Sequence, residues 1–129
     1  RVESYWQRRH EIWQRYNEAF KDMPITLPFN PEPNTRHAHH LYTILIDKAQ
    51  AGISRDDFLD AITLENIGVG VHYLSIPEHP YYQRTFGWKP DDYPNAMRIG
   101  RQTVSLPLSA NLSSEDVSDV IKATKSILQ

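Results

Sequence analysis

The spacing of apolar residues predicts one helix at the start of the chain and another at its end. Over residues 1–22, apolar side chains recur every three or four residues, and charged and amide side chains fill the opposite face. The same spacing follows Ser113, and Asp116 lies where a capping box needs it. We expect both stripes, including Trp6, Trp13 and Tyr16, to pack in a core or an interface.

Short β-branched and aromatic runs between these helices predict strands. We expect three of them, at residues 40–46, 69–73 and 104–108. Pro107 places the third at an edge of the sheet or keeps it very short. A helix opened by Ser54, with Gly68 as its positive-φ stop, separates the first two strands, which indicates a β-α-β unit.

The remaining segments complete a small α/β domain. Four prolines make residues 24–38 an extended connector, and Pro80 and Pro94 each begin a further helix, the first over 79–86. We therefore predict a single domain over 1–129. It has a leading helix (1–22) and an α/β core (38–129), with a short, mainly antiparallel sheet of about three strands packed with helices.

Composition narrows the function classes. The chain has 129 residues, a net charge of −2 and no cysteine. It contains no basic stripe for nucleic acid and no apolar run that could span a membrane. Disulfide scaffolds and thiolate metal sites are excluded, and a cytoplasmic protein is the expectation. The first residue is Arg1 rather than Met, which hints at a longer parent chain.

Histidine and tyrosine gather in one stiff run, residues 68–82. His72 and Tyr73 end the predicted second strand, so their side chains point to opposite sides. Ligands of α/β units collect beyond the carboxyl ends of strands, which suits a polar ligand here. His79 begins the helix that follows. Packing of an aromatic pair at a strand end explains His72 and Tyr73 equally well.

The other histidines allow two simpler interpretations. His37 and His39 would share a face of an extended segment, and together with His72 or His79 they could bind zinc. The spacing matches no metal-ligand pattern, so we predict no metal site. His40 is expected to be an interior histidine, hydrogen-bonded at the start of its strand.

Several catalytic signatures are missing from the sequence. It has no Ser-His-Asp constellation, no phosphate-binding P-loop and no G-x-G-x-x-G. Its lysines fall at helix ends, in turns and in the last helix, where no desolvated Schiff-base amine is expected: Lys21, Lys48, Lys89, Lys122 and Lys125. We therefore assign no catalytic residue to the chain.

A series of short motifs nevertheless occurs in an informative order: Gly70-Val71-His72-Tyr73, His79-Pro80-Tyr81-Tyr82-Gln83, Phe86-Gly87, Tyr93-Pro94-Asn95-Ala96 and Ser105-Leu106-Pro107-Leu108. Over nearly its whole length, the chain resembles the C-terminal (small) domain of the DegT/StrS family of pyridoxal-phosphate-dependent sugar-nucleotide aminotransferases. The combination of motifs is specific, although each one alone would be weak.

The resemblance implies a fold-type I parent enzyme that works as a homodimer and transfers an amino group from glutamate to a nucleotide-linked keto-sugar. It implies that pyridoxal 5'-phosphate and its lysine belong mainly to an N-terminal domain absent here, so that this chain alone is inactive. The C-terminal domain would close the active site. His72, Tyr73 and His79 would contact the substrate.

One position departs from the family, and one other function stays open. Pro77 stands where family members often carry a histidine, and whether His79 replaces that histidine is open. The alternative function is a freestanding, non-catalytic binding or regulatory domain with the same fold. A third possibility is a His-rich metal-binding domain.

Overall fold

The structure is a computed structural model that describes all 129 residues. The elements, in chain order, are α1 (Val2–Phe20), β1 (Tyr42–Leu45), α2 (Lys48–Ala51), α3 (Arg55–Leu64), η1 (Ile76–Glu78), α4 (Pro80–Phe86), η2 (Pro90–Asp92), α5 (Pro94–Gln102), β2 (Thr103–Leu106) and α6 (Ser114–Leu128), where η marks a 3-10 helix. None of the helices has both the length and the apolar composition to span a membrane.

The sheet is small and antiparallel. β1 and β2 pair so that Thr43 lies opposite Ser105. Single bridges extend the pair on both sides, from Thr26 to Leu45 of β1 and from Gly70 to Ser105 of β2. The predicted class, a short antiparallel sheet packed with helices, is confirmed, with two strands in place of about three.

Two local predictions are wrong and a third is met in part. Residues 69–73 form no strand, because they pair only at Gly70 and then leave the sheet; Gly70 pairs with β2 rather than β1, so no β-α-β unit forms. Asn66 adopts the positive φ, 60°, expected of Gly68, since asparagine tolerates that conformation. The expectation for Pro107, an edge position or a very short strand, is met by the second alternative, since β2 has four residues and ends before Pro107, with β1 on one side and Gly70 on the other.

The predicted helices are present where the sequence carries capping signals. Ser54 and Ser113 accept hydrogen bonds from the backbone N–H groups of Asp57 and Asp116, and Asp116 completes a capping box. α4 and α5 begin at Pro80 and Pro94. Local sequence therefore determines where these helices begin.

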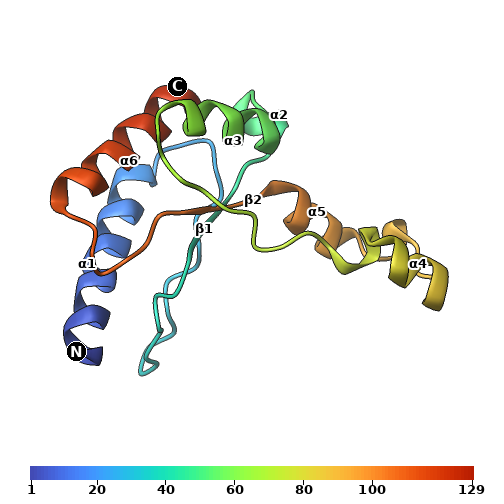
Figure 1. The fold of residues 1–129 in the computed structure, drawn as a ribbon, viewed down its shortest axis with the longest axis horizontal. Helices are drawn as coiled ribbons and strands as arrows, with labels where there is room; N and C mark the ends of the chain where they lie inside the picture. Colours follow the sequence, from blue (N-terminus) through green and yellow to red (C-terminus); the bar gives the residue numbers. More distant parts are fainter.

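A single apolar core joins α1, α3, α6 and the sheet. Figure 1 shows α1 and α6 side by side, with α3 beside the C-terminal end of α6. The core has 15 buried members, none of them from residues 63–103: Ile12, Trp13, Tyr16, Phe20, Tyr42, Ile44, Ile46, Phe58, Ile62, Val104, Leu106, Val117, Val120, Ala123 and Leu128. We call residues 1–70 and 103–129 the body.

Residues 71–102, which we call the arm, extend away from the body (Figure 1). They contain η1, α4, η2 and α5, and α4 buries none of its residues. Of the eleven exposed large hydrophobic residues, seven lie in the arm: Tyr73, Leu74, Ile76, Tyr81, Phe86, Tyr93 and Ile99. The arm therefore carries apolar surface that the rest of the chain leaves uncovered.

Candidate functional site

His72 lies where the chain leaves the sheet. The Gly70 bridge fixes the backbone just before it, with Ser105 N donating to Gly70 O over 2.8 Å. The half-buried His72 ring then turns back toward β2, where its Nδ1 lies 2.9 Å from Ser105 Oγ. Ser105 Oγ is also 3.2 Å from Thr43 Oγ1 on β1. His72 is thus attached to the sheet by its side chain.

Tyr73 is exposed, and its ring packs edge-on against that of His72, with 5.0 Å between ring centroids and an interplanar angle of 88°. The two side chains therefore lie together, and the prediction that they point to opposite sides is wrong, because residues 71–73 form no strand. Tyr73 and His79 line an open hollow of about 440 Å³ together with Val71 and Leu74. The structure thus brings two predicted site residues, Tyr73 and His79, together around one hollow. His72 lies next to Tyr73 but does not line the hollow, because its ring contacts the sheet.

α5 packs against the segment between Tyr73 and His79. Ser75 is buried, and its Oγ donates to Ala96 O over 2.5 Å. Gly100 makes this contact possible, because a Cβ there would overlap Ser75 Oγ and lie 2.7 Å from Ser75 N. Pro77 is buried in η1 and its carbonyl accepts from Gln83 Nε2, so this position offers the hollow no imidazole.

His79 precedes α4 without capping it. Its side chain makes no capping hydrogen bond and is exposed, so the imidazole is available to a ligand. An aromatic row follows along the arm, in which Tyr82 stacks on Trp88 at 5.5 Å between ring centroids and Trp88 contacts Tyr93. No motif in the sequence predicted this row, although the density of aromatic residues from 81 to 93 could have indicated it.

The remaining histidines form a separate cluster against α1. His39 is 1% exposed, and its ring nitrogens lie 3.0 Å from His10 Nδ1 and 3.3 Å from His37 Nδ1. Burial, reinforced by positive charge on His37 and His10, lowers the pKa of His39 to about 4. No group of three His, Cys, Asp or Glu side chains in the chain is arranged to hold a metal ion.

The interior histidine is His39 rather than His40. His40 is exposed and its side chain makes no hydrogen bond, so the role predicted for it is wrong. The physical reason is local: His39 has φ 46°, which breaks the alternation of strand side chains before β1 begins at Tyr42.

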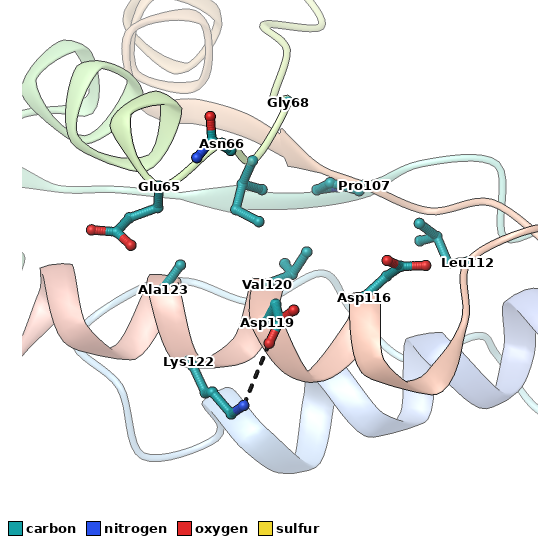
Figure 2. A pocket seen from close by; sticks show the side chains of 11 residues that line it. Glu65, Asn66, Gly68, Pro107, Leu112, Asp116, Asp119, Val120, Lys122 and Ala123 are labelled. Atoms are coloured by element: carbon teal, nitrogen blue, oxygen red, sulfur yellow. Dashed lines mark hydrogen bonds and ion pairs between the residues drawn. The ribbon is translucent and has the colours of Figure 1, made fainter.

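The largest hollow lies elsewhere, between the 65–68 loop and α6 (Figure 2). It measures about 700 Å³ and includes none of the predicted site residues. Asp116 is engaged in the α6 cap, which lowers its pKa, and Asp119 pairs with Lys122 at 3.4 Å. Because these acidic groups already have partners, size alone does not make this hollow the candidate site.

The lysines lie mostly on the surface. Lys21 and Lys122 are exposed and paired with Glu18 and Asp119, while Lys48 and Lys89 are also exposed. Lys125 is half-buried on α6 and lines none of the hollows described above.

Comparison with known proteins relates this chain to one enzyme family. Residues 1–125 match the DegT/DnrJ/EryC1/StrS aminotransferase family. The spore coat polysaccharide biosynthesis protein SpsC of Bacillus subtilis is 42% identical over 131 residues, covering 100% of this chain and 33% of that protein.

Two solved structures share the fold. A putative sugar aminotransferase, Spr1654 from Streptococcus pneumoniae, superposes with a TM-score of 0.88 at 27% identity, over 98% of this chain and 31% of its own. Helicobacter pylori PseC, an aminotransferase involved in the biosynthesis of pseudoaminic acid, gives 0.83 at 27% identity, over 96% and 33%. The chain thus spans about a third of the length of these relatives. Spr1654 has also been solved in PLP and PMP forms.

Proposed function

The chain belongs to the DegT/DnrJ/EryC1/StrS aminotransferase family, and on that premise we propose that it is the C-terminal small domain of a larger sugar aminotransferase. The observation that carries the proposal is the match over residues 1–125, combined with coverage of only about a third of each relative. The whole enzyme, a cytoplasmic homodimer, transfers an amino group from glutamate to a nucleotide-linked keto-sugar. It uses pyridoxal 5'-phosphate, held by residues outside this chain.

The arm supplies the contribution of this chain to that active site. Tyr73 and His79 line its open hollow, and His72 stands beside them with its Nε2 unbonded within the chain. A phenol and two imidazoles can donate to and accept from sugar hydroxyls and phosphate oxygens. The exposed apolar side chains around them pack against the rest of the enzyme, so that the arm excludes water when it closes over the substrate.

Kinetics of the complete enzyme test these contacts. The probes are a UDP-linked and a dTDP-linked keto-sugar, with glutamate as donor. We expect Tyr73→Phe, His79→Ala and His72→Ala each to raise the KM for the keto-sugar several-fold and to leave the KM for glutamate unchanged. Tyr5→Phe, which alters an exposed tyrosine on the body, is the matched control. Unchanged keto-sugar KM values in all three variants would contradict the proposal.

The isolated chain gives a second test. Because we propose that residues outside this chain hold the cofactor, the 129-residue chain mixed with pyridoxal phosphate, glutamate and keto-sugar should turn nothing over. Turnover above that of the free cofactor would contradict the proposal that residues outside this chain hold the cofactor.

One observation favours the alternative, a freestanding binding domain. The body has a core of 15 buried hydrophobic residues of its own, enough for it to fold without a second domain. The gene upstream of Arg1 decides between the two functions. A continuous reading frame that encodes a lysine-bearing large domain supports the aminotransferase, and a start codon directly before Arg1 supports the freestanding domain.

A further inference from the structure

We infer that Ser105, backed by Thr43, is a positioning residue that orients the His72 imidazole toward the substrate. The inference rests on the proposed role of His72 in substrate binding. Ser105 lies on β2 in the body, is 5% exposed and touches none of the hollows described above. Its effect on the substrate is therefore transmitted entirely through His72.

Ser105 holds the start of the arm with three groups. Its backbone N–H and C=O both pair with Gly70, and its hydroxyl reaches His72 Nδ1 at 2.9 Å. The backbone pair fixes the position of the chain, and the hydroxyl fixes the rotation of the ring. The register of β1 and β2 sets Thr43 directly opposite, so its hydroxyl lies 3.2 Å from that of Ser105.

Only one direction of the hydrogen bonds satisfies both hydroxyl hydrogens within the chain, and the inference takes that direction. If Thr43 donates to Ser105 and Ser105 donates to His72 Nδ1, each hydroxyl hydrogen has a partner inside the chain. In the reverse direction, the Thr43 hydroxyl hydrogen would have none, because Oγ1 makes no other hydrogen bond. The first arrangement leaves the proton of neutral His72 on Nε2, and Nε2 is not sealed in the interior. His72 then presents a donor to the substrate.

Gly70 provides the surface on which the ring rests. A Cβ at this position would lie 2.7 Å from His72 Cε1, closer than real contacts allow. A side chain at residue 70 would therefore turn the imidazole away from Ser105 without changing either hydroxyl. Gly68, two residues earlier, has nothing within 4 Å of its Cβ position, and neither glycine has a positive φ.

Five variants separate positioning from simple packing. Ser105→Ala and Thr43→Val remove the two hydroxyls, and Gly70→Ala displaces the ring. Thr103→Val is the control for the hydroxyl variants, because its buried Oγ1 on the same strand has no hydrogen-bond partner. Gly68→Ala is the control for Gly70→Ala.

The first measurement is independent of activity. In the 129-residue chain labelled with 15N-histidine, we expect a nuclear Overhauser effect between His72 Hε1 and the Gly70 α-protons, and the Nε2–H tautomer at His72. Ser105→Ala and Gly70→Ala should both lose this effect, and Thr103→Val and Gly68→Ala should retain it. Retention of the effect and the tautomer in Ser105→Ala would overturn the inference.

The second measurement uses the complete enzyme with the UDP-linked and dTDP-linked keto-sugars. Loss of one hydrogen bond should raise the keto-sugar KM about tenfold in Ser105→Ala, with kcat and the glutamate KM little changed. Gly70→Ala should match it, Thr43→Val should give a few-fold rise, and both controls should stay within about twofold. If His72→Ala raises this KM and Ser105→Ala does not, the inference is wrong and the proposed function stands. If His72→Ala has no effect, the proposed role of His72 fails too.

Discussion

The body and the arm differ in how many of their large apolar side chains they bury: the body holds the whole 15-residue core, and the arm holds seven of the eleven exposed ones. In the body, Phe20 is fully buried among Tyr16 and Tyr42, whereas in the arm Phe86 is 57% exposed although it stacks on Tyr82. Both phenylalanines sit at the end of a helix, so helix formation does not explain the difference. The body encloses a core of its own, while the arm leaves most of its large aromatic side chains exposed, as surfaces that bind a partner do.

Truncation of these two phenylalanines is the strongest test of the comparison. Phe20→Ala should lower the free energy of unfolding by about 3–5 kcal/mol, because it leaves a cavity in a closed core. Phe86→Ala should lower it by less than about 1 kcal/mol, because the side chain is already largely in water. Chemical denaturation followed by circular dichroism measures both. Equal losses would show that the arm is as self-contained as the body.

Gly100, where α5 packs against the segment that contains Ser75, is the next most sensitive position. Gly100→Ala would push a methyl group into Ser75, so we expect a loss of roughly 1–3 kcal/mol. Gly68→Ala, which meets open space, is the matched control and should be nearly neutral. Proteolysis of folded protein should cut Gly100→Ala within the arm first. A stable, protease-resistant Gly100→Ala variant would contradict the packing described for Ser75.

Acid should weaken the body through His39. Its pKa in the folded chain is lowered to about 4 from an ordinary value of 6.5, so below pH 6.5 the unfolded chain binds a proton that the folded chain does not. Stability is therefore present above about pH 6.5 and is lost as pH falls toward 4, by on the order of 2 kcal/mol. Denaturation midpoints across this range measure the loss. The slope should shrink in His39→Gln and persist in His40→Gln, since His40 is exposed.

Changes at helix N-caps should give the smallest difference in stability between two variants. Ser113→Ala removes the capping box of α6 and should cost about 1 kcal/mol. His79→Ala should leave stability unchanged, because the His79 side chain does not cap α4. Thermal denaturation of both variants checks this contrast. A larger loss in His79→Ala would mean that the imidazole supports the arm and is not free for a ligand.

Local signals in the sequence were sufficient for the starts of α3, α4, α5 and α6, but α2, which Asp47 caps, was not predicted. Ser54, Ser113, Pro80 and Pro94 each mark a helix start with a chemistry that acts within one turn, and the structure begins its helices there. The apolar stripe of 1–22 correctly indicated burial of Trp13 and Tyr16. The family motifs were recognisable for the same reason, since they are short and ordered along the chain.

Contacts between distant residues could not be predicted. The Ser105–His72 hydrogen bond joins positions 33 residues apart, and the close approach of Gly100 to Ser75 depends on how α5 folds back. A strand was expected at 69–73 because Val69 and Val71 favour extended backbone. In the structure only Gly70 has a partner to pair with, so no strand forms. The choice of His39 over His40 depends on one left-handed residue that no periodicity reveals. The assignment of His72, Tyr73 and His79 to the substrate remains a prediction.

Hydrogen–deuterium exchange on the isolated chain and on the complete enzyme tests most directly whether the arm is finished by another part of the protein. We predict that amides of the arm, residues 71–102, exchange much more slowly in the complete enzyme, while those of α1, α6 and β1 change little. The same exchange rates for the arm in both forms would contradict the proposal that it packs against the rest of an aminotransferase.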